Sequence, residues 1–388
     1  MKRTSLSLLL ALCFLLLGSC ASAGGGGAAP VPAPDTPAPE GPEPTPAIPA
    51  PTPVLDTAER CLASMTREEK LCQMLLLCSS DDGELLSAAE HGVGGLCLYT
   101  ASFAGKDRDE VAAMTANLQA RSPIPLLLAV DEEGGVVNRV SWNPQLRRSP
   151  FASPRMLYLR GGWDLIESDT EEKAQLLLSL GLNVNLAPVA DIPKTNANFI
   201  FPRCVSIYPE ETAEYVERVV RVMKREGIGS AVKHFPGYGG SADTHTGQAF
   251  DERPYEAFTE GDFLPFIAGI EAGADAVLVS HNIVLCMDPE RPASLSPEVH
   301  RILREDLGFE GVILCDDLSM EAIGQFAASE HPAVLAAQAG NDLLCCGDRE
   351  GALEAMLGAL EDGRLSEEQV DRSVLRVLRW KLALGLAV

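Results

Sequence analysis

The chain has few basic residues and lacks the cysteine spacing of a metal site. Lys and Arg number 31 against 55 Asp and Glu, so the formal net charge is −24. Nucleic acids and anionic lipid surfaces carry charge of the same sign and are therefore poor partners for this protein. The 11 cysteines include no C-x-x-C pair and no Cys/His spacing that suggests zinc. The composition thus argues against nucleic-acid binding and against a structural zinc site.

The cysteines do not indicate a disulfide framework either. Cys13 and Cys20 lie in the N-terminal segment, which leaves an odd number, nine, for the rest of the chain. Cys97, Cys315 and the Cys345-Cys346 pair lie inside apolar runs, where cysteine behaves as a small buried hydrophobe. We therefore expect mostly free thiols.

The N-terminal apolar run is too short for a transmembrane helix of the mature protein. Two basic residues precede the run Leu6–Leu17, and Gly18-Ser19-Cys20 follows it. This arrangement resembles a bacterial lipoprotein signal, so we predict that residues 1–20 form the signal and that Cys20 is lipidated. An ordinary signal peptide, cut after Ala21 or Ala23, is the alternative. Both predict export, and acyl chains on Cys20 would anchor the protein to the membrane.

Residues 21–53 lack almost all aromatic and branched side chains. They consist mainly of Gly, Ala, Pro, Glu and Thr, which cannot bury enough apolar surface to order the segment. We predict a disordered linker here. No second segment of this kind interrupts residues 54–388, and their length suits one folded domain.

Short apolar runs recur along residues 54–388, and segments with helical spacing separate them. Continuously apolar strands that alternate with helices indicate a parallel sheet covered by helices. The eight runs predict a single (β/α)₈ barrel of the TIM type, and an open doubly wound sheet is the alternative. The expected strands lie within Gln73–Cys78, Gly95–Tyr99, Pro125–Asp131, Asn183–Asp191, Gly229–His234, Ala276–His281, Gly311–Asp316 and Asp342–Cys346. The expected helices include Asp107–Ala120, Ser168–Gly181, Glu210–Gly227, Glu256–Gly273 and Ser296–Leu307.

Polar residues stand at the ends of five of these runs. In a barrel, the carboxyl ends of all strands face one bowl, where such enzymes keep their chemistry. In an open sheet, the same residues would be divided across a crevice. We predict one shared small-molecule site at this face. The strand-end groups are Asp131-Glu132-Glu133, Asp191, Lys233-His234, His281-Asn282 and Asp316-Asp317.

The loop after Lys233-His234 is the most informative segment of the chain. Its Pro and Gly residues break the strand, so that polar groups are presented at the strand end. Asp243 and His245 are two positions apart, which lets the carboxylate orient the imidazole and raise its basicity. Adjacent strand residues point to opposite sides, which favours Lys233 as a site residue and leaves a structural role open for His234.

Five segments in this order resemble the β-N-acetylhexosaminidase branch of glycoside hydrolase family 3. The similarity covers roughly residues 58–386 and implies a single barrel without a cofactor or a metal ion. Five ordered motifs are more specific than any one of them. The segments are Leu128-Ala-Val-Asp131-Glu-Glu-Gly-Gly135, Lys233-His-Phe-Pro-Gly-Tyr-Gly239, Asp243-Thr-His245, Pro292-Ala-Ser-Leu-Ser296 and Leu303–Met320.

The resemblance implies a role for each polar group. It places the carboxylate nucleophile at Asp316 and the general acid/base at His245, oriented by Asp243. These residue types suit retaining hydrolysis, in which one group attacks the anomeric carbon and another protonates the departing oxygen. The residues that the resemblance assigns to the substrate are Asp131, Arg203, Lys233, His234 and His281.

Five positions depart from the family pattern. Glu132 stands where relatives often have Gln, Val136 where they often have Arg, and Tyr238 where His is common. Cys204-Val205 replace the usual small-aromatic pair beside Arg203. None of these changes removes a proposed catalytic group.

The resemblance predicts an exported glycosidase that removes terminal, non-reducing β-linked N-acetylglucosamine. The envelope setting suggests peptidoglycan fragments as the substrate. A β-glucosidase is one alternative, and a phosphorylase is another, because a histidine acid/base avoids carboxylate–phosphate repulsion. A non-catalytic lipoprotein that binds cell-wall sugars and a metal-dependent barrel hydrolase are further alternatives.

Overall fold

The computed structural model describes residues 56–241, 243–244, 247–324, 326 and 330–388. Residues 54–388 form one compact unit. The predicted signal with Cys20, the predicted linker and His245 lie outside the described residues.

Eight parallel strands close into a barrel in the order β1-β10-β9-β7-β5-β4-β3-β2. The barrel closes where the first strand pairs with the last, with Leu76 opposite Cys345. The predicted (β/α)₈ barrel is therefore confirmed and the open sheet is excluded, and each strand lies in or overlaps one of the eight predicted runs. The strands are β1 (Leu75–Ser79), β2 (Gly95–Leu98), β3 (Leu127–Val130), β4 (Val184–Asn185), β5 (Gly229–Phe235), β7 (Ala276–Val279), β9 (Val312–Cys315) and β10 (Leu343–Cys346).

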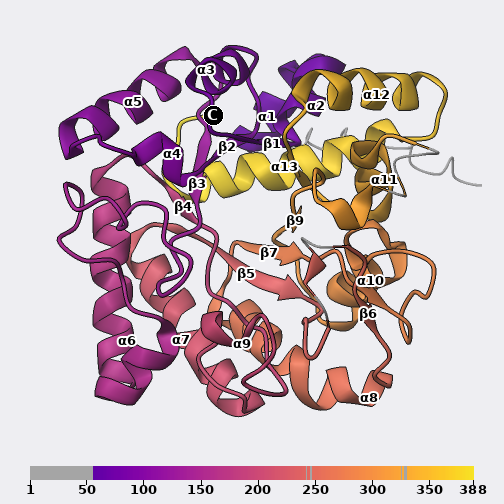
Figure 1. Ribbon diagram of the computed structural model, residues 1–388. Coiled ribbons are helices and arrows are strands. Elements are labelled where there is room, and N and C mark those ends of the chain that lie inside the picture. The colour runs from indigo at the N-terminus through magenta and orange to yellow at the C-terminus, as the bar shows by residue number, and fades with distance from the viewer. Residues whose placement is uncertain (1–55, 242, 245–246, 325, 327–329) are drawn as a thin grey trace, which may run out of the picture. The chain divides into compact units, whose positions relative to one another are not determined.

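Helices surround this sheet, with α6 and α7 on one side of the barrel in Figure 1 and α10 and α11 on the other. The α-helices are α1 (Thr57–Ser64), α2 (Arg67–Gln73), α3 (Asp82–Glu90), α4 (Thr100–Phe103), α5 (Arg108–Arg121), α6 (Pro154–Ser179), α7 (Pro209–Glu226), α8 (Tyr255–Ala257), α9 (Phe263–Ala272), α10 (Pro297–Arg301), α11 (Pro332–Ala339), α12 (Arg349–Glu361) and α13 (Glu367–Ala383). Shorter helical turns are η1 (Phe201–Arg203), η3 (Phe258–Asp262), η4 (Ala293–Leu295), η5 (Ile302–Asp306) and η6 (Glu321–Ile323).

The barrel strands are buried along their whole length because side chains fill the interior and helices cover the outside. The helices begin and end at residues suited to those positions. Ser153 caps α6 by accepting a hydrogen bond from the backbone N–H of Met156. Gly227 ends α7 in the left-handed conformation, at φ 81°.

Three predicted helices differ from the structure. The helix expected from Ser168 starts further upstream, within α6 (Pro154–Ser179), which is kinked at Gly162, where φ is 63°. The helix expected over Ser296–Leu307 is divided into α10 and the π-helical segment η5. The helix expected over Glu256–Gly273 is divided into α8, η3 and α9, of which η3 is a π-helical segment.

A second, two-stranded parallel sheet pairs β6 (Phe250–Asp251) with β8 (Ile283–Val284). It joins the end of the loop after β5 to the segment that follows β7. Two-residue strands carry no periodic pattern, so this sheet was not expected from the sequence.

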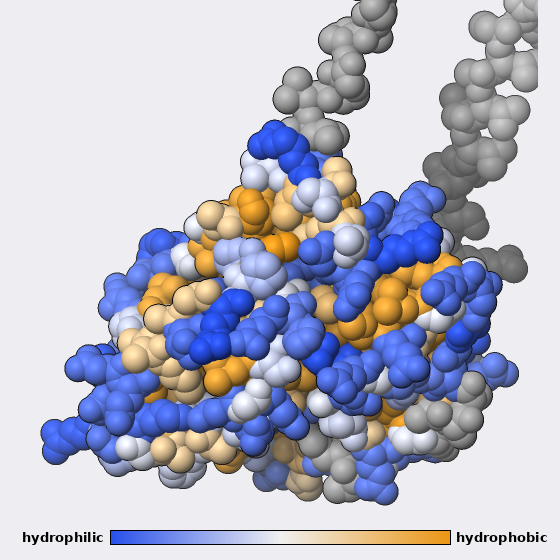
Figure 2. Space-filling view, turned by 90° about the horizontal axis from the view of Figure 1, so that it is seen from above, coloured by the Kyte–Doolittle hydropathy of each residue, from blue (hydrophilic) through white to orange (hydrophobic). Residues whose placement is uncertain are grey.

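The surface seen in Figure 2 is mostly hydrophilic, with apolar patches between the charged areas. Within the described ranges, no helix combines the length and the apolar character that crossing a bilayer requires.

Candidate active site

Lys233 is the centre of a charged cluster at the barrel's strand ends. Its ammonium nitrogen lies 2.6 Å from Asp131 Oδ1 and 2.7 Å from Glu133 Oε1. Lys233 extends from the end of β5, while Asp131 and Glu133 follow β3. Burial alone would lower the pKa of Lys233, but the two carboxylates raise it above its ordinary value, so the side chain stays charged.

Arg203 joins this cluster through a two-pronged ion pair with Glu133. Its Nε and Nη2 donate to the two carboxylate oxygens at 2.9 and 2.8 Å. Burial would raise the pKa of Glu133, but the charges of Arg203 and Lys233 hold it well below its ordinary value. The buried Glu133 therefore fixes two cations that the sequence assigned to the substrate.

His234 lies between an acid and a base in the same cluster. Its Nδ1 is 2.6 Å from Asp191 Oδ2, and its Nε2 is 3.0 Å from Arg203 Nη2. Arg203 can only donate and the carboxylate of Asp191 accepts, so the neutral tautomer with hydrogen on Nδ1 satisfies both contacts. Asp191, one of the expected strand-end groups, thus orients His234.

Both members of the Lys233-His234 pair join the cluster, contrary to the alternation expected of a regular strand. The reason is a local irregularity, because the pairing of β5 with β7 shifts register between Lys233 and Phe235. The peptide bond between Lys233 and His234 is cis.

Asp316 follows β9 and is half-buried on the same face of the barrel. Its Oδ1 accepts a hydrogen bond of 2.9 Å from the backbone N–H of Asp317. Burial would raise the pKa of Asp316, but His281, His234 and Lys233 and this hydrogen bond lower it below its ordinary value. Asp316 is therefore an ionised carboxylate at neutral pH.

The carboxylate of Asp317 has local partners, which distinguish it from Asp316. Its Oδ1 accepts from the backbone N–H and hydroxyl of Ser319 at 3.0 and 2.7 Å, and its Oδ2 accepts from the hydroxyl of Tyr99 at 3.2 Å. Neither aspartate caps a helix, because the turn η6 has Met320 at its N-cap position without a side-chain hydrogen bond. Asp316 therefore does not cap the turn η6 that follows it.

His281 supports the segment that carries Asp316. Its Nε2 donates to the backbone oxygen of Asp317 at 2.9 Å, and its Nδ1 lies 2.7 Å from the hydroxyl of Ser294, which can donate or accept. This geometry gives His281 a structural contact; its predicted contact with the substrate remains a prediction.

The loop between β5 and β6 is partly described. Asp243 is half-buried, Thr244 is buried, and His245 is not among the described residues, so the expected pairing of Asp243 with His245 remains a prediction. Gly237 and Gly239 both have positive φ, at 119° and 52°. A Cβ on Gly239 would lie 2.3 Å from the guanidinium of Arg253, so only glycine permits this close approach.

The carboxylate of Glu132 organises the segment after β3 and is buried away from the bowl. It accepts backbone hydrogen bonds from Arg139 and Val140 at 2.8 and 2.7 Å and contacts the hydroxyl of Ser141. The folded segment places Arg139 Nη2 4.0 Å from Asp131 Oδ2. Arg139 is thus a residue of the cluster that sequence reasoning missed. Glu133 was expected among the strand-end groups but was given no role, because neighbouring charges in a sequence give no sign of where each side chain points.

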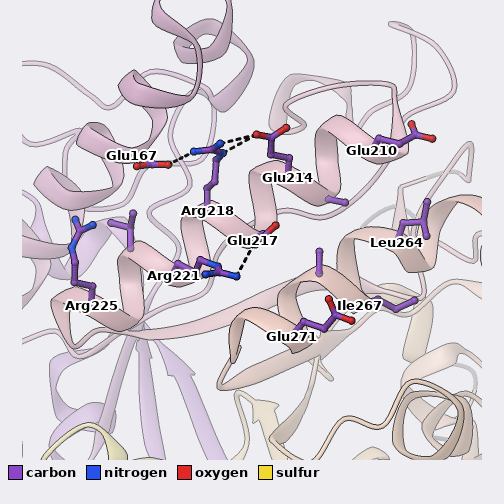
Figure 3. Close-up of a pocket in the computed structure, with 13 residues that line it drawn as sticks. Glu167, Glu210, Glu214, Glu217, Arg218, Arg221, Arg225, Leu264, Ile267 and Glu271 are labelled. Carbon is purple, nitrogen blue, oxygen red and sulfur yellow. Dashed lines mark hydrogen bonds and ion pairs between the residues drawn. The ribbon is translucent and has the colours of Figure 1, made fainter.

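A groove of about 920 Å³ lies elsewhere, on the outer surfaces of α6, α7 and α9. Figure 3 shows several of its charges paired, with Arg218 between Glu167 and Glu214 and Arg221 beside Glu217, while Arg225 pairs with Glu171 and Glu226 outside the groove lining. Such neutralised pairs on helix surfaces are typical of a solvated face. Across the described part of the chain, no group of three or more His, Cys, Asp or Glu is arranged to hold a metal ion.

The sequence matches the family described as Glycosyl hydrolase family 3 N terminal domain over residues 66–380. The chain belongs to glycoside hydrolase family 3. A relative from Xanthomonas campestris named beta-hexosaminidase is 34% identical over 250 residues, which cover 62% of this chain and 74% of that protein.

Solved structures of family 3 enzymes have the same fold. A β-N-acetylglucosaminidase from Paenibacillus is 31% identical, with a TM-score of 0.77, over 83% of this chain and 63% of that longer chain. A family 3 glycosyl hydrolase from Mycobacterium smegmatis is 30% identical, with a TM-score of 0.75, over 82% of this chain and 98% of the other. The chain is thus a glycoside hydrolase, and its strand-end cluster is the candidate active site.

We expect Glu133→Gln to destabilise the fold as well as the site. The substitution leaves the buried cations Lys233 and Arg203 without one of their anionic partners, which costs about 3 kcal/mol of unfolding free energy. Chemical denaturation at pH 7 measures this loss. The matched control is Glu172→Gln, because Glu172 forms a more exposed pair with Arg147 at 2.9 Å and its loss costs about 0.5 kcal/mol. Equal losses in the two variants would contradict the role given to Glu133.

Proposed function

We propose that this enzyme is a retaining β-N-acetylhexosaminidase that releases terminal, non-reducing β-linked N-acetylglucosamine. The observation that carries the proposal is the position of Asp316: it is half-buried and directly follows β9, at the strand-end face of the barrel where Lys233 holds Asp131 and Glu133. The names of the Xanthomonas and Paenibacillus relatives support the choice of an N-acetylated sugar.

In the proposed reaction, Asp316 attacks the anomeric carbon and forms a glycosyl-enzyme intermediate. His245, oriented by Asp243, protonates the departing oxygen and then takes a proton from the attacking water. The sugar hydroxyls bind to Asp131, whose carboxylate contacts Lys233, and to neighbouring groups. The other groups proposed to contact the sugar are Arg203, His234 and His281.

The proposed setting is the cell envelope. The lipoprotein-like signal ending at Cys20 supports export and a lipid anchor, and the linker over residues 21–53 would hold the barrel away from the membrane. Peptidoglycan fragments are then the proposed natural substrate, because they are the N-acetylglucosamine-containing glycans of that compartment.

Trapping the intermediate tests the proposal. A fluorinated N-acetylglucosamine analogue with an activated leaving group is expected to label the enzyme once, and peptide mapping is expected to place the label on Asp316. A label on Asp317, Glu132 or Asp131 would overturn the assignment. Nitrophenyl glycosides provide the specificity control: preference for the glucoside would indicate a β-glucosidase, and binding without turnover would indicate a sugar-binding protein. Turnover that depends on phosphate, with a sugar 1-phosphate as product, would indicate a phosphorylase.

A further inference from the structure

Tyr238 connects the sugar-binding cluster to the loop that carries Asp243. It follows β5 and is buried, with 2% of its surface exposed. Its hydroxyl lies 2.7 Å from the hydroxyl of Thr244, whose side chain is also buried. Thr244 stands between Asp243 and His245 in the sequence. The hydrogen bond from Tyr238 therefore contacts the residue between the proposed acid/base histidine and the aspartate that orients it.

The other contacts of Tyr238 are with residues of the strand-end cluster and with a neighbouring aromatic ring. Its backbone N–H donates to Asp191 Oδ1 at 2.8 Å, and Asp191 is the carboxylate that orients His234. Its ring packs edge-on against the ring of His234, with centroids 5.1 Å apart, and against Phe199 at the same distance. Because the ring is fixed on both sides, the hydroxyl of Tyr238 has a defined position.

A buried hydroxyl pair of this kind resists opening. Both hydroxyls are buried and out of reach of bulk water, so separating them leaves each without a hydrogen-bond partner. Burial also raises the pKa of Tyr238 well above its ordinary value, so the phenol keeps its proton and can donate it to Thr244.

We propose that Tyr238 is a positioning residue for the acid/base step, acting through its hydrogen bond to Thr244. Fixing Thr244 restricts the neighbouring Asp243, the carboxylate proposed to orient the acid/base group, because adjacent Cα atoms are only about 3.8 Å apart. The proposal rests on the proposed function, because it takes His245 as the group that protonates the leaving oxygen.

The variants Tyr238→Phe and Thr244→Val remove the same hydrogen bond from its two ends. Each is expected to lower kcat/KM about 10-fold for N-acetylglucosaminides with poor leaving groups such as alkyl alcohols, the effect of one buried hydrogen bond. For a dinitrophenyl leaving group, which needs no proton, kcat/KM is expected to change less than twofold. In the double variant, kcat/KM for these substrates is expected to fall no further than in either single variant, because both changes remove the same hydrogen bond. Thr244→Ser keeps a hydroxyl, so its kcat/KM is expected to stay close to the wild-type value.

Different results would contradict the positioning role of Tyr238 and the acid/base role of His245. Equal losses for both leaving groups, or losses that multiply in the double variant, would overturn the positioning role of Tyr238. So would unchanged rates in Tyr238→Phe when His245→Ala shows the leaving-group dependence. If His245→Ala itself shows no such dependence, the acid/base assignment fails, whatever Tyr238→Phe shows. Thermal melting of each variant provides the check on folding.

Discussion

Asp316→Gly is expected to lower kcat/KM for aryl N-acetylglucosaminides by roughly 10⁴-fold or more. Without the carboxylate, no group on that face of the sugar attacks the anomeric carbon, and the positive charge that develops there loses its counter-ion. Asp316 can act as the nucleophile because its carboxylate is ionised at neutral pH: despite its burial, His281, His234, the backbone N–H of Asp317 and Lys233 lower its pKa. Steady-state kinetics with a highly activated substrate measures the loss while the leaving group still departs easily.

Adding azide to the Asp316→Gly variant shows whether activity is lost because the nucleophile is missing or because the fold is damaged. The small anion fits the space that the missing side chain leaves, so it is expected to restore turnover and to give the α-glycosyl azide, the product of a single inversion. The matched control is Asp317→Gly, which opens the same space at a residue whose side-chain partners are Ser319 and Tyr99, and kcat/KM is expected to fall less than about 100-fold. Azide rescue in the Asp317 variant and not in the Asp316 variant would exchange the two roles.

His245→Ala is expected to have an effect that depends on the leaving group. For alkyl glycosides, which need a proton on the departing oxygen, kcat/KM is expected to fall about 10³-fold; for dinitrophenyl glycosides it is expected to fall less than about 5-fold. The measurement is a plot of kcat/KM against leaving-group pKa, which should be steep in the variant and shallow in the wild type.

Azide again supplies a stereochemical check. In the His245 variant it attacks the glycosyl-enzyme, so two inversions give the β-glycosyl azide, opposite to the product of the Asp316 variant. The matched control is His91→Ala, because His91 is exposed at the end of α3 and far along the chain from the strand-end cluster. A uniform loss across all leaving groups in the His245 variant would count against an acid role.

The barrel was predictable because its strands are continuously apolar and are separated by amphipathic helices. That pattern persists over enough residues to define the element type, as Gly229–His234 shows for β5. It does not define short elements. The strands β6 and β8 have only two residues each, which is too short for an alternating pattern. They pair because the segments after β5 and β7 run side by side, and the sequence around each strand does not reveal this.

The sequence predicted which residues of the candidate site lie on one face of the barrel better than it predicted which of their side chains contact each other. Strand-end position identified Asp131, Lys233 and Asp316, because the barrel brings all strand ends to one face. The sequence could not show that Glu133 is the shared partner of two cations, since Glu132 beside it has the same charge and the opposite orientation. Nor could it show the register shift that turns His234 toward the cluster.

The pairing of β1 with β10 has a consequence for how the chain acquires its fold. These two strands are the first and the last of the sheet, so the seam between them requires nearly the whole polypeptide to be present. Until β10 is made, an unfinished chain carries two unpaired edges that can join to other chains. Synthesis of this enzyme therefore includes a long interval of exposure to aggregation, which ends only when its C-terminal residues become available.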